Sequence, residues 1–268
     1  ATFTIEDTTD PVWEVAPIVD IYLYDCVEAT FNTPSASDNC GNVTITHVDL
    51  PRSGGCPTGM SYERVFTATD ECGNSIQAST FVHVNDLTPP SIDEDANDMT
   101  VECDGSGNVA AYQEWLANNA GFEASDNCSD VVITSVVSEL QGCSEFTGGY
   151  HVVFTATDAC GNQASSDANF YINDTTDPVL VGVPDNILNP VECDQIPAPA
   201  MVSADDLCSN AYVVMDESYD YGDESMCNYA IIRTWTATDE CGNTSMASQT
   251  INVQDNTAPV FDQEVMDI

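Results

Sequence analysis

One eight-residue block occurs three times in this chain of 268 residues and limits what the chain can fold into. The block reads Thr-Ala-Thr-Asp, then one variable residue, then Cys-Gly-Asn, and it begins at Thr67, Thr155 and Thr236. A block that returns every 81 to 88 residues is typical of an array of similar modules. The chain is therefore predicted to be a tandem repeat, and its function is to be sought in the array.

A second motif marks the boundaries between the modules. An acidic, threonine-containing segment that ends in proline recurs at residues 6–11, 85–90, 173–178 and 254–259. These segments predict an immunoglobulin-like repeat at each of residues 7–85, 86–173 and 174–254. Residues 1–6 are expected to be the terminal strand of a preceding repeat, and residues 255–268 the start of a following one. The ends are then either fragment boundaries or strands exchanged between subunits, as in donor-strand exchange.

Alternating residues predict β-strands through most of the chain. Residues 64–69 and 233–238 alternate apolar residues with threonine, and residues 76–84 alternate again after a Gly-Asn turn, which indicates a hairpin. Short strands, turn clusters and proline-marked joins predict an all-β fold: tandem immunoglobulin-like antiparallel β-sandwiches of seven strands in a linear array.

Residues 109–117 depart from this pattern. Val109, Tyr112, Trp115 and Leu116 share one helical face, which predicts a short helical insertion in the second repeat. Packing of Trp115 and Leu116 onto the sandwich is the favoured interpretation, because apolar helical stripes usually face a core. An exposed contact helix is the alternative.

The charge of the chain is strongly negative. The sequence has 45 acidic residues, no lysine and three arginines, for a formal net charge of -42. This charge excludes nucleic acid and anionic membrane surfaces as electrostatic partners. The sequence has no run of 18 apolar residues, so we expect no membrane span in this segment. Bound cations would relieve the self-repulsion, and a well-solvated acidic surface is the alternative.

The twelve cysteines divide as four in each predicted repeat. Zinc sites usually bring cysteines in close pairs, whereas the shortest spacing here is 14 residues, so disulfides are expected. Disulfides indicate an oxidising compartment, and therefore an extracellular or cell-surface protein.

The pairing of these cysteines can be argued from strand geometry. Two cysteines that flank one strand cannot pair, because a strand of about ten residues spans roughly 33 Å and bridged α-carbons lie within about 7 Å. The second and fourth cysteines of a repeat are expected at the end where the chain enters it, and the first and third at the other end. The predicted disulfides are Cys26–Cys56, Cys40–Cys72, Cys103–Cys143, Cys128–Cys160, Cys193–Cys227 and Cys208–Cys241.

The same geometry gathers aspartates at the upstream end of each repeat. Hard oxygen ligands without histidine or thiolate suit Ca²⁺, so we predict one structural calcium ion at each junction. The alternative is ordinary turn chemistry, in which Asp and Asn hold loops. The predicted ligands are Asp7, Asp10, Asp38 and Asp70 at the first junction, Asp86, Asp126 and Asp158 at the second, and Asp174, Asp177, Asp206 and Asp239 at the third. Pro89 stands in the second linker where the others have another aspartate.

The sequence does not favour an enzyme, and we predict no catalytic residues. The three histidines, His47, His83 and His151, lie in or beside strand patterns without a companion nucleophile. Glycine-rich phosphate loops and a Gly-x-Ser-x-Gly motif are absent. The many carboxylates would allow a glycosidase-like dyad, but their repetition at every junction indicates a structural role.

Several of these motifs together resemble a known family. The segments Asp-Thr-Thr-x-Pro, Val-Glu-Cys-Asp, Asp-Asn-Cys and Arg-Thr-Trp-Thr-Ala-Thr-Asp-Glu-Cys-Gly-Asn are similar to the HYR-like, immunoglobulin-like repeats of giant Bacteroidota surface adhesins of the SprB-like gliding-motility type. The resemblance covers essentially the whole chain. It implies a secreted, adhesive or filamentous stalk at the cell surface, exported by the type IX route.

Taken together, these observations predict a structural repeat segment of a secreted cell-surface adhesin or extracellular filament, a rod braced by disulfides and inter-domain calcium. One alternative is a glycan- or protein-binding adhesin module that uses the helical insertion around Trp115. Another is a filament subunit with exchanged terminal strands. The expected partners are neighbouring repeats of the same or identical chains, with surface glycans or proteins as further candidates.

Overall fold

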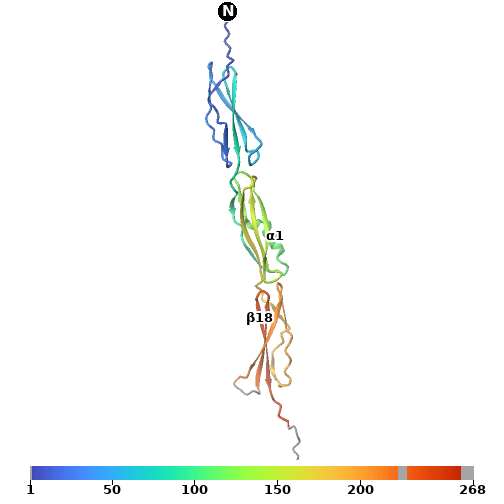
Figure 1. Cartoon of the computed structure of the whole chain (residues 1–268). Coiled ribbons are helices and arrows are strands. Elements are labelled where there is room, and N and C mark those ends of the chain that lie inside the picture. The colour runs from blue at the N-terminus through green and yellow to red at the C-terminus, as the bar shows by residue number, and fades with distance from the viewer. Residues whose placement is uncertain (1, 223–227, 261–268) are drawn as a thin grey trace, which may run out of the picture. The chain divides into compact units, whose positions relative to one another are not determined.

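The protein is built almost entirely of β-strands (Figure 1). The computed structural model describes residues 2–222 and 228–260. Within these residues, each predicted repeat contributes six strands. Repeat 1 has β1 (Val12–Val15), β2 (Asp20–Leu23), β3 (Ser35–Ser37), β4 (Thr44–Pro51), β5 (Tyr62–Thr69) and β6 (Ser75–Val84). Repeat 2 has β7 (Ser91–Glu94), β8 (Met99–Glu102), β9 (Glu123–Ser125), β10 (Val132–Gln141), β11 (Gly148–Thr157) and β12 (Gln163–Asn173). Repeat 3 has β13 (Val179–Val181), β14 (Ile187–Val191), β15 (Ser203–Asp205), β16 (Ala211–Asp220), β17 (Asn228–Asp239) and β18 (Thr244–Gln254).

Each repeat pairs these strands into a two-stranded and a four-stranded sheet. The first and third strands pair antiparallel, as β1 with β3. The other four form the larger sheet, in the order β2-β6-β5-β4 in repeat 1. The predicted all-β fold of tandem β-sandwiches is confirmed. Two details differ from the prediction: the described residues give six strands per repeat rather than seven, and the second strand runs parallel to the last one, as β2 does to β6.

The chain divides into two compact units. The first consists of Ala1–Asn97, Ala117–Val137 and Val152–Ala168, and the second of Asp98–Leu116, Ser138–His151 and Asn169–Ile268. The dividing points fall between β7 and β8, within α1, and within β10, β11 and β12, all in repeat 2. The first unit therefore contains the junction between repeats 1 and 2, and the second unit contains the junction between repeats 2 and 3.

Apolar side chains at alternate positions of the long strands fill the core of each repeat. Successive side chains of a strand point to opposite faces of the sheet. In β11, Val152, Phe154 and Ala156 are fully buried while the residues between them are partly exposed. In β17, Trp235 is buried in the same way, at 1% exposure.

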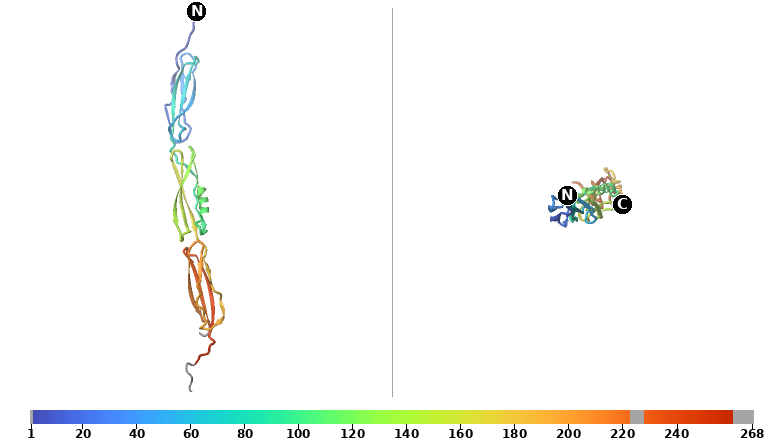
Figure 2. Two further views of the ribbon diagram at one scale, coloured as in Figure 1. Left: turned by 90° about the vertical axis from the view of Figure 1, so that its right-hand side faces the viewer. Right: turned by 90° about the horizontal axis from the view of Figure 1, so that it is seen from above.

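Helix α1 (Val109–Ala117) forms at the predicted residues in the second repeat. The helix lies beside the strands of the second repeat (Figure 2). Its aromatic side chains contact strands of the four-stranded sheet: the Trp115 ring lies 5.5 Å from that of Phe170, and Tyr112 stacks on Tyr150 at 4.0 Å. Trp115 is buried, as the core interpretation predicts, and is not exposed to contact a ligand. Among the described residues, no helix is both long and apolar enough to cross a bilayer.

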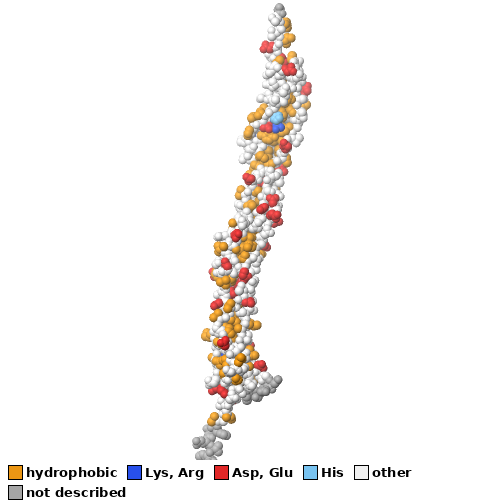
Figure 3. All heavy atoms as spheres, turned by 180° about the vertical axis from the view of Figure 1, so that it is seen from behind, with side chains coloured by type: hydrophobic (Ala, Val, Ile, Leu, Met, Phe, Trp, Pro, Cys, Tyr) orange, Lys and Arg blue, Asp and Glu red, His pale blue; other side chains and the backbone are white. Residues whose placement is uncertain are grey.

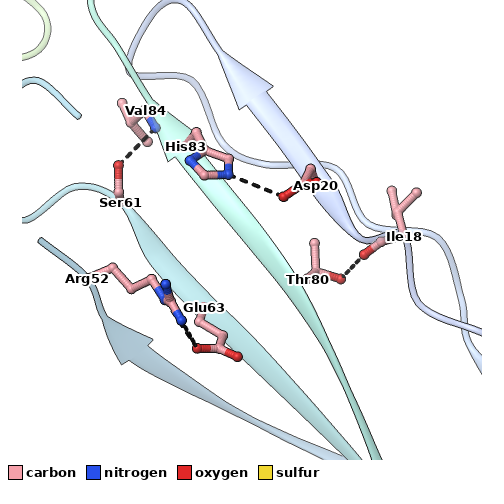
Figure 4. Close-up of polar contacts among 8 residues, drawn as sticks. All are labelled: Ile18, Asp20, Arg52, Ser61, Glu63, Thr80, His83 and Val84. Carbon is pink, nitrogen blue, oxygen red and sulfur yellow. Dashed lines mark hydrogen bonds and ion pairs between the residues drawn. The ribbon is translucent and has the colours of Figure 1, made fainter. Parts of the chain in front are cut away.

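The three arginines of the chain are paired with carboxylates on the long strands. Arg64 makes two hydrogen bonds to Asp49, both of 2.7 Å, and Arg52 bonds Glu63 at 2.8 Å (Figure 4). Arg233, which is buried, bonds Glu217 at 2.8 Å. All three arginines are thus bound to carboxylates of the sheets. The junction carboxylates therefore have no lysine or arginine partner in the part of the chain that the structure describes.

Side-chain contacts also hold the parallel strand of repeat 1 in place. The Thr80 hydroxyl donates to the carbonyl of Ile18 at 2.5 Å, and His83 Nε2 lies 3.2 Å from Asp20 Oδ1 (Figure 4). The His83 ring also stacks on Tyr22. These contacts give His83 a structural position at the pairing of β2 with β6.

Four disulfides link consecutive repeats, two at the junction of repeats 1 and 2 and two at the junction of repeats 2 and 3. Because β2 runs parallel to β6, Cys26, which follows β2, lies at the end where β6 leaves the repeat. The Cys56 amide bonds the carbonyl of Val84 at the same end. The four bonds are Cys26–Cys128, Cys56–Cys160, Cys103–Cys208 and Cys143–Cys241, with α-carbons 5.0 to 6.0 Å apart.

The predicted pairing within repeats is therefore wrong for five of the six pairs. Four of these, Cys26–Cys56, Cys103–Cys143, Cys128–Cys160 and Cys208–Cys241, are replaced by the bonds between repeats. In the fifth, Cys40 and Cys72 are both unbonded. The geometric argument compared only cysteines of one repeat, whereas a junction brings cysteines of two repeats within bridging distance. The sixth predicted pair, Cys193–Cys227, includes a residue outside the described ranges and stays a prediction.

We expect peptide mapping of the non-reduced protein to recover these bonds. Digestion with an acid-residue-specific protease suits a chain with so many carboxylates. It should release Cys26 linked to Cys128 and Cys103 linked to Cys208. Recovery of Cys26 linked to Cys56 would contradict the arrangement of the junctions.

Removing the partner of the buried Arg233 should weaken repeat 3. Glu217→Gln is expected to lower local stability by about 1.5–3 kcal/mol, the usual range for a hydrogen bond to a charged group. Hydrogen bonds from Tyr219 and then Arg233 lower the Glu217 pKa from its ordinary 4.5. The stability that ionised Glu217 contributes is therefore present above pH 4.5 and is lost as the pH falls through the folded-state pKa of Glu217.

Amide hydrogen exchange in β17 measures this effect. The exposed neighbour Asp216 provides the matched control, Asp216→Asn, which should leave β17 protection unchanged. Equal exchange in the two variants would show that the ion pair does not stabilise the repeat.

Candidate metal centres at the junctions

Three groups of aspartates lie at the upstream ends of the repeats. In each group one carboxylate oxygen from every member lies within 4.8 Å of the others. Acidic side chains are also spread over the surface, with few basic ones among them (Figure 3). The three groups of aspartates at the upstream ends are Asp7, Asp38 and Asp70; Asp86, Asp126 and Asp158; and Asp174, Asp206 and Asp239. The structure thus brings together nine of the eleven predicted ligands.

The aspartate of the repeated block organises the hairpin turn that follows it. Asp70 Oδ1 accepts hydrogen bonds from the amides of Cys72, Gly73 and Asn74 at 2.6 to 2.9 Å. The turn needs glycine because Gly73 has a φ of 97°, a conformation that side chains rarely adopt. The hydrogen bond from the Asn74 side chain, followed by those from the amides, lowers the pKa of Asp70. The turn role that the alternative predicted is therefore present.

The asparagine that ends the block fastens the linker to this turn. Asn74 Nδ2 donates to Asp70 Oδ2 at 2.8 Å and to the carbonyl of Asp7 at 3.2 Å. The same two contacts recur from Asn162 and from Asn243. Sequence reasoning did not assign this role, although the asparagine is part of every copy of the block.

The linker and loop aspartates each use a carboxylate oxygen to hold their own turn. Asp86 Oδ1 accepts from the Thr88 amide at 2.9 Å, and Asp126 Oδ2 accepts from the amides of Cys128 and Ser129. The first group follows this pattern, with Asp38 Oδ1 accepting from the Cys40 amide. The other carboxylate oxygens of Asp86, Asp126 and Asp38 have no hydrogen bond within the described part of the chain, so a carboxylate can serve a turn and a ligand together.

Asp86 has the least satisfied environment of these groups. The residue is 2% exposed, and its Oδ2 is buried without a hydrogen-bond partner in the described residues. Burial raises its pKa, and the nearby charges of Asp126, Asp158 and Asp25 raise it further. Like charges about 4 Å apart repel by roughly 4 kcal/mol at the effective dielectric constant of a protein surface. A cation in this position would supply the missing partner and reduce the repulsion.

The third group differs in one contact. Burial raises the pKa of Asp174, and the charges of Asp206 and Asp239 act in the same direction. Its Oδ2 accepts a hydrogen bond from the Ser209 hydroxyl at 3.1 Å. This hydroxyl oxygen is itself a hard ligand, so the contact leaves the group suited to a cation.

Two predicted ligands lie outside the groups. Asp10 is exposed, and Asp177 Oδ1 accepts from the Thr244 amide at 3.2 Å. Neither is within the described clusters of potential metal ligands. Their position in the linker motif suggested a ligand role, but the structure places Asp177 in a hydrogen bond with the first residue of β18.

Asp25 is a potential ligand that sequence reasoning missed. It lies near Asp86 at the second junction, and its Oδ1 accepts from Asn127 Nδ2 at 2.6 Å. Cys128 belongs to the same group but is in a disulfide and offers no thiolate. An acidic residue precedes the first cysteine of every repeat, and this repetition was the available signal.

The equivalent residues of the other repeats bind the linker directly. Glu102 accepts from the Thr175 amide and hydroxyl, both at 2.8 Å, and from the Thr176 hydroxyl. The backbone hydrogen bond from Thr175 is the main cause of its lowered pKa. In repeat 3, Glu192 accepts from the Asn256 amide in the same manner.

Comparison with known proteins gives limited similarity. No protein-family model matches the chain. It is 32% identical over 152 residues to the "Sushi, von Willebrand factor type A, EGF and pentraxin domain-containing protein 1" of Rattus norvegicus, covering 55% of this chain and 4% of that protein. It is 27% identical over 160 residues to an uncharacterised 81.3 kDa protein of Acholeplasma phage L2, covering 57% of this chain and 21% of that protein. The chain thus matches a small part of each relative's length.

Solved structures with similar strands include cadherin repeats. Drosophila N-cadherin EC1-4 aligns with a TM-score of 0.30 and 13% identity, over 92% of this chain and 76% of that one. Human CDH23 EC21-23 aligns with a TM-score of 0.32 and 12% identity, over 91% of this chain and all of that one. Similarity at this level carries no argument about ligands or partners. The resemblance to Bacteroidota adhesin repeats stays a prediction.

Removing a junction asparagine should loosen the linker it holds. Asn162→Ala deletes the hydrogen bonds to Asp158 Oδ2 and to the Asp86 carbonyl, so a local loss of about 1–2 kcal/mol is expected. Hydrogen exchange of the amides at 86–88 and 160–163 would report it. The adjacent, exposed Gln163→Ala is the control and should leave these amides unchanged. Identical exchange in both variants would mean that Asn162 does not hold the linker.

Proposed function

We propose that this chain is a structural repeat segment of an extracellular adhesive or filamentous protein, in which calcium ions and disulfides fix each repeat to the next. The observation that carries the proposal is the buried, unpartnered Oδ2 of Asp86 among the carboxylates of Asp126 and Asp158. A structural role, rather than a catalytic one, is favoured because the same arrangement recurs at every junction. The four disulfides indicate folding in an oxidising compartment.

The donor set favours calcium over other ions. Each group offers carboxylate oxygens without histidine, and the neighbouring cysteines in the second and third groups are disulfide-bonded, which disfavours zinc and copper. Calcium accepts six to eight oxygens in flexible geometries, whereas magnesium requires a nearly octahedral shell and retains most of its water. Carboxylates already held in turns suit the more permissive ion, with water and backbone carbonyls completing the shell.

The role of the ion follows from where its ligands lie in the chain. One ligand comes from the linker, and the other two come from loops of the repeat that follows. At the second junction Asp25 adds a carboxylate from the preceding repeat, since it lies with Asp86. Bound calcium would therefore hold linker and loops together, while the disulfides join the same two repeats covalently.

The donor-strand alternative is supported by one observation. Phe3 and Ile5 are 93% and 85% exposed, although the equivalent Ile251 and Val253 of β18 are fully buried. A neighbouring subunit that paired with residues 2–5 would cover them. The helix-contact alternative has no comparable support, because its proposed contact residue Trp115 is buried.

Calcium titration of the chelator-treated protein tests the proposal. In about 150 mM salt, which screens weak surface binding, we expect saturable calcium binding at the junctions and slower hydrogen exchange of the linker amides. Asp126→Asn should weaken the second site at least tenfold, since even residues that only support a ligand commonly cost that much.

Asp93→Asn is the matched control, because Asp93 is an exposed aspartate of the same repeat outside the groups. It should bind calcium as the unmodified protein does. Absence of saturable binding, or equal affinities in the two variants, would refute the calcium sites.

A further inference from the structure

The disulfides follow one rule at both junctions inside the chain. We call the first and third cysteines of a repeat its downstream pair, and the second and fourth its upstream pair. The downstream pair of repeat 1, Cys26 and Cys56, bonds the upstream pair of repeat 2, Cys128 and Cys160. The downstream pair of repeat 2 bonds the upstream pair of repeat 3 in the same order, as Cys103–Cys208 and Cys143–Cys241.

The upstream pair of repeat 1 has no partner in the described residues. Cys40 and Cys72 are both exposed and both unbonded. Their loops nevertheless have the form of the bonded ones. The Cys40 amide donates to Asp38 Oδ1 at 2.8 Å, as the amides of Cys128 and Cys208 do to their aspartates at the same distance. The loop of the unbonded Cys40 thus has the same hydrogen bond as the loops of the bonded cysteines.

The hairpin turns that carry Cys72 and the bonded Cys160 also have matching hydrogen bonds. The Cys72 amide donates to Asp70 Oδ1 at 2.9 Å, and the amide of the bonded Cys160 donates to Asp158 Oδ1 at 2.7 Å. Both turns are also held to their linkers by an asparagine side chain, since Asn74 and Asn162 each donate to a linker carbonyl at 3.2 Å. The surface that receives a downstream pair at the two internal junctions is therefore present at the first repeat with its cysteines reduced.

We propose that Cys40 and Cys72 form a covalent docking site for another repeat of this kind, and that the third repeat of a second copy of this chain fits it. Cys193 is the matching first cysteine of a downstream pair; it is exposed and forms no disulfide with a described residue. In sequence, Cys227 occupies the position of Cys56 and Cys143. The bond assigned is from Cys193 of one copy to Cys40 of the other.

The chemistry is thiol–disulfide exchange with a small-molecule disulfide such as oxidised glutathione. One cysteine thiolate attacks the glutathione disulfide, forms a mixed disulfide and releases one reduced glutathione. The second cysteine thiolate then attacks the protein sulfur and releases the other glutathione. Two thiols lose two protons and two electrons in all, and the glutathione disulfide takes up both electrons. Calcium takes no part in this step. The test of the docking site is therefore independent of the calcium sites.

Two complementary variants test the docking site. One carries Cys193→Ser and Cys227→Ser and retains the upstream pair of repeat 1; the other carries Cys40→Ser and Cys72→Ser and retains the downstream pair of repeat 3. Each is incubated alone and with the other in a glutathione redox buffer that contains chelator. We expect a covalent dimer on a non-reducing gel from the mixture alone, and a ladder of multimers from the unmodified protein.

Peptide mapping then decides the outcome. A digest of the dimer should contain Cys40 linked to Cys193, and the four internal disulfides should be intact in both variants, which shows that the substitutions did not disturb folding. A mixture that stays monomeric with both variants correctly folded would overturn the proposal. So would an internal Cys40–Cys72 bond, or dimers that form equally in either variant alone.

Discussion

The junctions depend on the parallel pairing of the second strand of each repeat with its last strand. In repeat 1 this pairing places the residues after β2 beside the residues after β6. The cysteine that follows the second strand is thereby brought to the point where the chain leaves the repeat. The loop before β5 reaches the same point, since the Cys56 amide bonds the carbonyl of Val84. With an antiparallel arrangement, Cys26 would lie at the opposite end, and no disulfide could connect it to the following repeat.

The acidic clusters show that a residue whose carboxylate holds a turn can keep its second oxygen free of hydrogen bonds. A carboxylate has two oxygens and about four sites for hydrogen bonds or ligands. In Asp86 one oxygen holds the Thr88 amide and the other is buried without a partner. The two interpretations that the sequence left open are therefore not exclusive. The turn fixes the carboxylate in advance, which lowers the entropy lost when an ion binds.

Much of the fold follows from local patterns. The strands at residues 64–69 and 76–84, the hairpin turn between them and the helix at 109–117 all form where alternation, the Gly-Asn turn and the apolar helical face indicated. Convergence of the linker, loop and hairpin aspartates at the junctions could also be predicted, because chain direction alone determines which loops share an end. The parallel pairing of β2 with β6 could not, since a short strand of four residues carries no signal of its partner or direction.

The disulfides depend on information that lies outside any one repeat. A comparison of cysteines within a module finds two at each end and pairs them there. Their true partners depend on how closely the next module approaches, which is a property of the linker and of tertiary packing. Asp25 was missed for the same reason, because the carboxylate that it lies with, Asp86, belongs to the linker that begins repeat 2.

The spans closed by the four disulfides overlap along the chain. They cover 26–128, 56–160, 103–208 and 143–241, so every peptide bond between Cys26 and Cys241 lies inside at least one of them. A single backbone cleavage anywhere in this stretch leaves the two pieces covalently attached. A single protease cut in an exposed loop would consequently not sever the molecule.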